Sequence, residues 1–234
     1  MNKEQIELEK LNKKYDQLQK KYGAKELKSV YNGGCIQNPD ICFVFMNPTR
    51  RNIASSKTWK GLKSPWIGTK NIWKLFYQLE LLDKEIYDKI KSSDKNWSEA
   101  FAKKVYDSVK SHNYFITNLG KCTQLDARVL KDNVYKNYLE LLKKELEIVN
   151  PKVIILFGNQ VSKIVLNKNI SVSKSRKEKY ILEINNKKYD CYTVFYPVGN
   201  GSFNIDKSIE DIKYIIKEEL KWLEKWIYIM NHLI

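Results

Sequence analysis

The sequence predicts an α/β protein, a three-layer α/β/α sandwich built on a central, mainly parallel four-stranded sheet. Two observations predict this class. Short apolar runs alternate along the chain with segments whose apolar residues recur at helical spacing. Those runs are also apolar without interruption, which is typical of strands that helices cover on both faces. No repeat, low-complexity tract or flexible linker interrupts the chain, so we expect one domain over residues 31–234, preceded by a helical extension over residues 1–30.

The expected elements follow from this pattern in chain order. Apolar residues at 3-4-3 spacing predict a helix over residues 4–22. A buried strand is expected over residues 41–46, where Asn47-Pro48 ends it, and a helix follows the next loop over residues 72–82. The remaining expected elements are a helix at 97–110, a strand at 114–117, a helix at 132–149, a strand at 153–157, a helix at 160–166, a hairpin of 180–184 and 188–195, and a helix from 207 to the C-terminus.

Positive charge is concentrated in one predicted loop. The chain has 42 Lys and Arg residues against 27 Asp and Glu residues, a net charge of +15. A lysine-rich composition can follow simply from an AT-rich genome, but clustering does not. Between Pro48 and Phe76 there is no acidic residue, and the basic residues there are Arg50, Arg51, Lys57, Lys60, Lys63, Lys70 and Lys74. This distribution favours nucleic acid as the partner.

Apolar runs and cysteines exclude several other classes. The longest apolar runs, such as residues 153–157, are far shorter than the ~20 residues that a membrane span needs. No apolar leader follows Met1, so we expect a cytoplasmic protein with no membrane partner. The four cysteines form no C-x-x-C pair, so we expect reduced thiols and no zinc or other metal site.

Amide side chains recur where the predicted strands end. Ligands of parallel sheets bind beyond the carboxyl ends of the strands. The residues at those positions are Asn47-Pro48-Thr49, Asn118 to Lys121, Gly158-Asn159-Gln160 and Tyr196 to Asn200. They supply neutral donors and acceptors but no Ser/His/Asp set, paired carboxylates or glycine-rich phosphate loop. Such a site suits recognition of a base edge, although each Asn taken singly is also common in turns.

In this order the segments resemble the uracil-DNA glycosylase superfamily, over roughly residues 40–205. Phe45-Met46-Asn47-Pro48 resembles the G-[IM]-N-P-G motif of its mismatch-specific and single-strand-selective branches, and Ser64 to Gly68 is similar to the P-F-V-G stretch of its thermostable iron–sulfur branch. The further similar segments are Asn71-Ile72-Trp73 to N-x-F-W, Ile116 to Cys122 to T-N-x-V-K-C, Pro151 to Gln160 to P-K-V-I-[VA]-x-L-G-x-x-A, and Tyr196 to Asn204 to the H-P-S or N-P-S-G-x-N loop.

The resemblance implies roles for individual residues. Asn47 would orient the attacking water, Trp66 would stack on the extruded base, and Asn118 would pair with the pyrimidine edge. Met46 and Pro48 would line the substrate site beside Asn47. The implied DNA contacts are Arg50, Arg51, Lys63 and Lys121 for phosphates, and Gly199, Asn200, Ser202 and Phe203 in the loop that fills the vacated stack.

The chain departs from the family pattern at four positions. Phe45 and Thr49 replace the two glycines of the first motif, and Tyr196 replaces the His or Asn of the last. Tyr196 is a candidate catalytic residue whose hydroxyl would donate a hydrogen bond to the departing base. The alternative is a tyrosine that only packs at the strand end. Cys122 matches one cysteine of the iron–sulfur branch, but Tyr135 stands where its downstream partner is expected. We therefore expect no iron–sulfur cluster and no other cofactor.

Together these features predict a monomeric, monofunctional DNA glycosylase. It would excise uracil or a related deaminated base from DNA by hydrolysing the N-glycosidic bond. Two alternatives remain open: a non-catalytic nucleic-acid-binding protein on the same fold, and an N-glycosidic enzyme that acts on free nucleosides or nucleotides. The second alternative has no need of the basic loop.

Overall fold

The protein is described by a computed structural model of residues 2–93, 96–127 and 129–232, in which the side chains of Asn200 and of residues 221–232 fall outside the described part. Its strands form one mixed sheet in the order β1-β3-β2-β4-β6-β5. The four central strands are mutually parallel: β3 (Tyr114–Asn118), β2 (Ile41–Phe45), β4 (Val153–Phe157) and β6 (Lys187–Val194). The edge strands β1 (Asn32–Gly34) and β5 (Lys179–Ile184) are antiparallel to their neighbours.

The predicted α/β/α sandwich is confirmed, with six strands in the sheet instead of four. The first additional strand is β5, the outer arm of the predicted hairpin, which continues the sheet beyond β6. The second is β1, whose sequence Asn-Gly-Gly has no apolar residue from which a strand could be predicted.

Helices and short 3₁₀ turns connect the strands. They are α1 (Lys3–Tyr22), η1 (Ile53–Ser55), α2 (Asn71–Gln78), α3 (Lys84–Ser92), α4 (Glu99–Ser111), α5 (Asp132–Val149), α6 (Asn159–Leu166), η2 (Gly199–Asn204) and α7 (Ile205–His232). The helix predicted over residues 72–82 ends earlier, at Gln78, because Glu80 takes a left-handed conformation with φ 62°. Helix α3, which was not predicted, then begins at Lys84.

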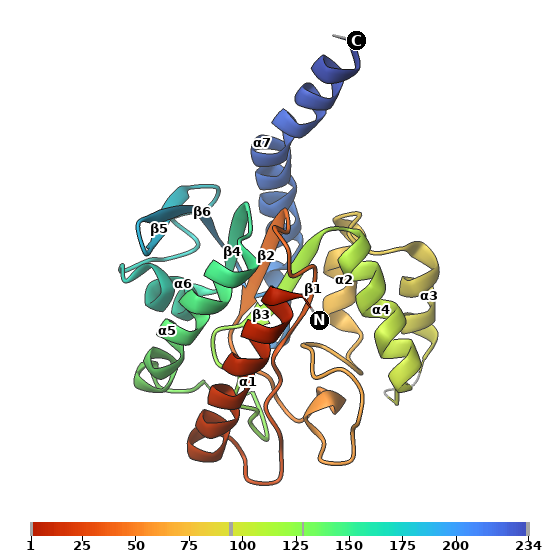
Figure 1. Ribbon diagram of the computed structural model, residues 1–234, viewed down its shortest axis with the longest axis vertical. Helices are drawn as coiled ribbons and strands as arrows, with labels where there is room; N and C mark the ends of the chain where they lie inside the picture. Colours follow the sequence, from red (N-terminus) through yellow and green to blue (C-terminus); the bar gives the residue numbers. More distant parts are fainter. Residues whose placement is uncertain (1, 94–95, 128, 233–234) are drawn as a thin grey trace.

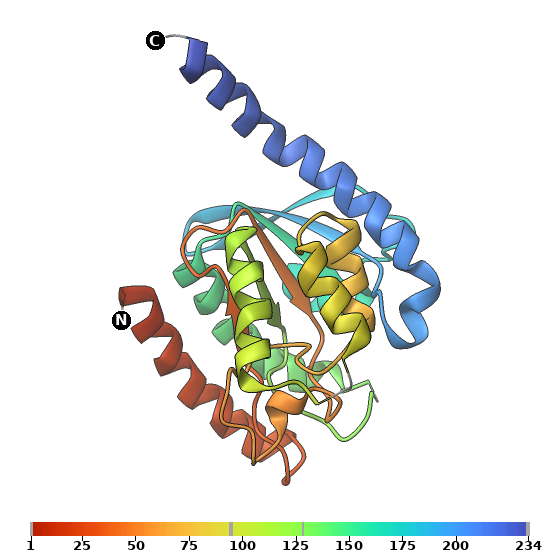
Figure 2. The same cartoon turned by 90° about the vertical axis from the view of Figure 1, so that its right-hand side faces the viewer.

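Two hydrophobic cores lie on the two faces of the sheet. Side chains alternate along each central strand, so Phe43 and Phe45 of β2 face one core while Cys42 and Val44 face the other. Helices α2, α3, α4 and α7 cover the first core, and α1, α5 and α6 cover the second (Figures 1 and 2). This three-layer arrangement leaves the carboxyl ends of the parallel strands uncovered by helices, at the lower end of the molecule in Figure 1.

The two terminal helices differ in how they meet the sheet. Helix α1 packs along α5 and buries Leu8, Leu11 and Tyr15 in the second core. Helix α7 begins beside β6, and its later turns extend away from the body of the molecule (Figure 2). Within the described residues, no helix combines the length and the apolar composition needed to cross a bilayer.

Candidate active site

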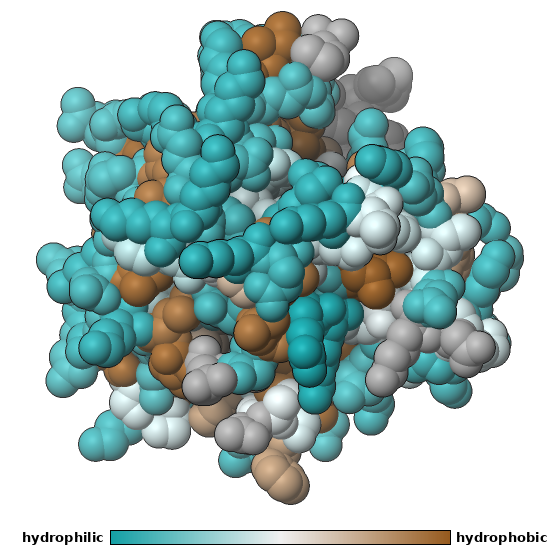
Figure 3. Space-filling view, turned by 90° about the horizontal axis from the view of Figure 1, so that it is seen from below, coloured by the Kyte–Doolittle hydropathy of each residue, from teal (hydrophilic) through white to brown (hydrophobic). Residues whose placement is uncertain are grey.

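The carboxyl ends of the central strands bring the predicted site residues together. In the pairing of β2 with β3, Phe45 lies opposite Asn118, so the segments that follow the two strands leave the sheet side by side. Backbone hydrogen bonds join these segments, since Leu119 N donates to Phe45 O at 2.7 Å and Gly120 N donates to Met46 O at 2.8 Å. Figure 3 looks onto this end, where hydrophilic side chains dominate and hydrophobic ones form patches between them.

Asn118 is buried and has an unused hydrogen-bond donor. Its side chain is 2% exposed, and its Nδ2 has no partner among the described residues. Its backbone oxygen is held in place by Lys121, whose Nζ donates to it at 2.6 Å. A buried amide donor without an acceptor costs about 1–3 kcal/mol, so this Nδ2 is available to an acceptor atom that enters the site.

Asn47 lies on the neighbouring segment and is half-buried. Its Oδ1 accepts a hydrogen bond from the Tyr135 hydroxyl at 2.5 Å, and its Nδ2 donates to the backbone oxygen of Pro48 at 3.1 Å. The Oδ1 atom has two lone pairs, so one acceptor position remains for a water molecule. Pro48 itself is buried, and the half-buried Met46 side chain packs on the second core.

An aromatic wall forms the other side of the site. Phe45 stacks on Phe157 at 4.2 Å between ring centroids, and its edge meets Trp66 at 5.0 Å and Tyr196 at 6.2 Å. Trp66 is half-buried, its φ is +66°, and its buried indole Nε1 has no partner among the residues that the structure describes. A non-glycine residue in this conformation is strained, and such strain is concentrated at functional sites. Phe45 thus contacts both Trp66 and Tyr196, the two aromatic residues of the predicted site.

Tyr196 follows β6 and lies close to the Asn47 segment. Burial raises the pKa of Tyr196, and a hydrogen bond with the backbone N–H of Met46 opposes that rise. Burial also raises the pKa of the nearby Tyr135, and the charge interaction with Tyr196 adds to that rise. Tyr196 is therefore a neutral hydroxyl beside the predicted water-binding amide.

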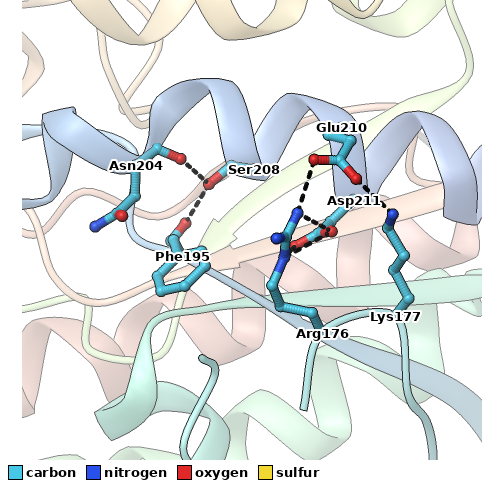
Figure 4. A network of polar contacts seen from close by, with 7 residues as sticks. All are labelled: Arg176, Lys177, Phe195, Asn204, Ser208, Glu210 and Asp211. Atoms are coloured by element: carbon cyan, nitrogen blue, oxygen red, sulfur yellow. Dashed lines mark hydrogen bonds and ion pairs between the residues drawn. The ribbon is translucent and has the colours of Figure 1, made fainter. Parts of the chain in front are cut away.

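Polar contacts anchor the ends of the loop after Tyr196 and the start of α7 (Figure 4). The Ser208 hydroxyl lies 3.0 Å from the backbone oxygen of Phe195 and 3.1 Å from that of Asn204, which ties the two ends of the loop to the first turn of α7. Arg176, from the segment between α6 and β5, makes a two-pronged contact with the buried Asp211 of α7 at 2.9 Å.

This network leaves the tip of the loop free to contact a partner. Within it Gly199 and Ser202 are exposed, and Phe203 is 92% exposed. The Asn200 side chain, the remaining predicted contact of this loop, lies outside the described residues. An exposed phenylalanine on an anchored loop has the character of a side chain that inserts into another molecule.

The predicted phosphate contacts differ in their surroundings. Arg50 and Arg51 are exposed on the segment that follows β2, where Arg50 N donates to Gln124 O at 2.8 Å. Lys63 is only half-buried and lies over the Tyr31 ring at 5.6 Å. Its burial lowers the pKa of Lys63, as does the neighbouring Lys28.

Lys121 is not a DNA contact, and this prediction needs correction. The side chain has no exposed area, and its Nζ forms an ion pair with Glu145 Oε2 at 2.7 Å. The buried carboxylate draws the ammonium group inward, so it cannot reach a phosphate outside the fold. Its role is structural, beneath Asn118.

Sequence reasoning missed two residues of this region, Glu145 and the Tyr135 hydroxyl. Glu145 falls on the apolar stripe of α5 with Leu142 and Val149, a position where a carboxylate needs a buried partner. From the sequence, Tyr135 was expected only to stand in place of a cluster cysteine, with no role for its hydroxyl. The four cysteines are free thiols, and no group of three or more His, Cys, Asp or Glu side chains in the described part of the chain could hold a metal ion.

The fold is an α/β/α sandwich, and the site lies at the carboxyl ends of its central strands. There it combines two amides, an aromatic wall and an exposed basic loop, which are elements of nucleobase recognition. A family model described as the uracil DNA glycosylase superfamily matches residues 32–224. The chain therefore belongs to this superfamily, whose members act on DNA and carry out glycosylase-type cleavage of N-glycosidic bonds. Comparison with curated proteins gives no significant match.

Proposed function

We propose that the protein is a DNA glycosylase that extrudes uracil or a related deaminated base and hydrolyses its N-glycosidic bond. The observation that carries this proposal is the buried Nδ2 donor of Asn118, which has no partner in the part of the chain that the structure describes, beside the half-buried Asn47. A base that presents a carbonyl oxygen at its Watson–Crick edge supplies the missing acceptor. Cytosine presents an amino group at the same position and leaves the donor unpaired, so the site disfavours it.

The aromatic wall supplies the stacking surface for the extruded base. Trp66 is half-buried and held by a T-shaped contact with the Phe45 ring, so it can accept a base with little rearrangement. Stacking of this kind contributes about 1–3 kcal/mol per base. It offsets part of the few kcal/mol that extrusion from a duplex costs.

The reaction itself needs a water molecule and stabilisation of the leaving base. The oxygen of water bonds to C1′ while the bond from C1′ to the base nitrogen breaks, and the electron pair of that bond leaves with the base. A proton of the water passes to solvent. Asn47 Oδ1 holds the water through its remaining lone pair, and neutral donors such as the Tyr196 hydroxyl stabilise the negative charge on the base.

Contacts with the DNA hold the opened strand. The exposed Arg50 and Arg51 follow Asn47 by a few residues in the chain, so they can contact phosphates next to the reacting nucleotide. Phe203, at the tip of the anchored loop, fills the space that the base has left in the stack. The charge of both arginines is independent of pH in the physiological range.

Single-turnover release of base from oligonucleotides tests the proposal. The panel contains uracil, hypoxanthine, xanthine and mismatched thymine, each in single-stranded and duplex form. We expect release from the uracil substrates, with Asn47→Ala retaining DNA binding but losing most of the rate. Binding without release from any substrate would support a non-catalytic DNA-binding protein, and release from free nucleosides with no salt-dependent binding to DNA would support the nucleoside enzyme.

A further inference from the structure

Tyr135 makes a contact with the site that the proposed function does not use. It lies in the first turn of α5, its side chain has no exposed area, and its hydroxyl donates to Asn47 Oδ1 at 2.5 Å. The two residues are 88 positions apart and belong to different elements, so the contact depends on the complete fold.

Contacts restrict both the Tyr135 ring and the start of the helix that carries it. The backbone of Gly120 passes so close that a β-carbon there would lie 3.1 Å from Cε1 of the ring. The start of α5 is fixed in turn by Gln160, whose Nε2 donates to Leu130 O and to Asp132 Oδ1, each at 2.8 Å. The hydroxyl therefore has little freedom to move away from Asn47.

The Asn47 amide has no comparable restraint of its own. Its other hydrogen bond, from Nδ2 to the backbone oxygen of the adjacent Pro48, is local and 3.1 Å long. The terminal torsion of an asparagine side chain is broad and roughly two-fold, so oxygen and nitrogen exchange places at low cost. If they exchanged, an N–H donor would face the water in place of the acceptor.

We propose that Tyr135 is a positioning residue that holds the Asn47 amide with its oxygen toward the attacking water. This inference rests on the function proposed for Asn47. A phenol donates one proton and occupies one lone pair of Oδ1, which leaves the second lone pair for the water. The donor also restricts rotation of the amide, so the water is presented to C1′ in one orientation. Tyr135 acts through Asn47 and has no contact with the base.

The experiment compares single-turnover excision by four variants: Tyr135→Phe, Asn47→Ala, the double variant Asn47→Ala/Tyr135→Phe, and Tyr138→Phe. Loss of the Tyr135 hydroxyl lowers the rate about 10- to 100-fold, the range expected from misplacing a reacting group, and leaves the affinity for uracil DNA within about twofold. In the Asn47→Ala background the same change has less than about a twofold effect, because there is no amide left to orient.

Tyr138→Phe is the matched control. Tyr138 lies one turn further along α5 and has no exposed area, and its hydroxyl interacts with Cys122 instead of Asn47. Its rate should equal that of the unmodified protein. Equal losses in Tyr135→Phe and Tyr138→Phe, or a full loss on top of Asn47→Ala, would overturn the proposal in favour of a purely structural role.

A second measurement does not depend on activity. The side-chain NH₂ signals of Asn47 in a ¹⁵N-labelled sample are assigned by their disappearance in Asn47→Ala. Tyr135→Phe should shift or broaden them, whereas Tyr138→Phe should not. If the unmodified protein releases no base, the proposed function fails while these signals still decide the positioning role. Unchanged Asn47 signals in Tyr135→Phe would refute it.

Discussion

Lys121 and Glu145 form an ion pair from which solvent is excluded: Nζ lies 2.7 Å from Oε2, and neither side chain has any exposed area. Glu145 also accepts hydrogen bonds from Tyr15 of α1, Asn32 of β1 and Thr117 of β3. Lys121 in turn donates to the backbone oxygen of Asn118. The pair thus joins four elements directly beneath the residue that is proposed to recognise the base.

Removing one partner of this pair should destabilise the fold strongly. Lys121→Met leaves the Glu145 carboxylate buried without its counter-ion, at an expected cost of about 3–5 kcal/mol in the free energy of unfolding. Urea denaturation followed by circular dichroism measures this change. In the double variant Lys121→Met/Glu145→Gln neither of these two positions carries a charge, so we expect part of the loss to be recovered.

An exposed ion pair provides the comparison. Lys84 and Asp88 of α3 form a pair at 2.5 Å, but their side chains are 75% and 52% exposed. Lys84→Met should therefore leave the urea midpoint close to that of the unmodified protein, because water screens an exposed pair. A loss in Lys121→Met as small as in Lys84→Met would contradict the structural role assigned to Lys121.

Asn118→Asp should impair uracil excision. The substitution keeps the size of the side chain but replaces the unpaired Nδ2 donor with a second carboxylate oxygen, which repels the base carbonyl. A site whose buried polar groups lose their match with the substrate discriminates by about 10⁴ or more, and we expect a rate loss of at least about 100-fold. Single-turnover release from uracil oligonucleotides measures it.

The same variant should still bind DNA without uracil. Asn118 is 2% exposed and lies at the base of the site, away from the exposed arginines. An undiminished excision rate in Asn118→Asp would remove Asn118 from base recognition.

The basic segment should determine the salt dependence of DNA binding. Each phosphate contact contributes about 0.9 to the slope of log K against log salt concentration for duplex DNA, so Arg50→Ala/Arg51→Ala should reduce that slope by about 1.8. Fluorescence anisotropy at several salt concentrations measures the slope. Lys187→Ala/Lys188→Ala is the matched control, because both lysines are exposed at the start of β6, at the amino ends of the parallel strands and so at the opposite end from the arginines. An equal reduction in the two double variants would indicate a diffuse charge effect in place of a binding segment.

Local sequence signals were sufficient to predict most of the fold. Helix α5 and strand β4 have the predicted bounds, since Asn150 in a left-handed conformation and Pro151 separate them. The recurrence of amides at strand ends also predicted a site beyond the carboxyl ends of the strands, and in the structure Asn47 and Asn118 lie at the ends of two paired strands.

What could not be predicted depends on contacts between distant residues. The basic character of Lys121 indicated a phosphate contact, and only the packing of α5 on the sheet shows that its charge is met by Glu145. The same holds for Tyr135, whose position in the chain carries no sign of a hydroxyl aimed at Asn47. Polar groups buried by tertiary packing have partners that no local pattern specifies.

Tyr196→Phe tests whether the hydroxyl at the end of β6 takes part in the reaction. The substitution removes only the hydroxyl and keeps the ring that packs against Phe45 at 6.2 Å. If the hydroxyl donates to the negative charge that develops on the departing base, the single-turnover rate should fall by roughly 10- to 1000-fold, as for the loss of one oxyanion-type donor or less. Affinity for uracil DNA should change little, because the charge develops only in the transition state.

The pH dependence of this effect separates a neutral donor from a titrating one. Burial raises the pKa of Tyr196 above its ordinary value of about 10, and an acid with a raised pKa keeps its proton to higher pH. The hydroxyl therefore stays protonated throughout the range from about pH 6 to 9, and the ratio of the Tyr196→Phe rate to the unmodified rate should be constant across it. A ratio that approaches one as the pH rises would mean that the phenol ionises in this range. A rate within about threefold of the unmodified protein at every pH would assign Tyr196 to packing, with Asn47 and backbone donors left to carry the reaction.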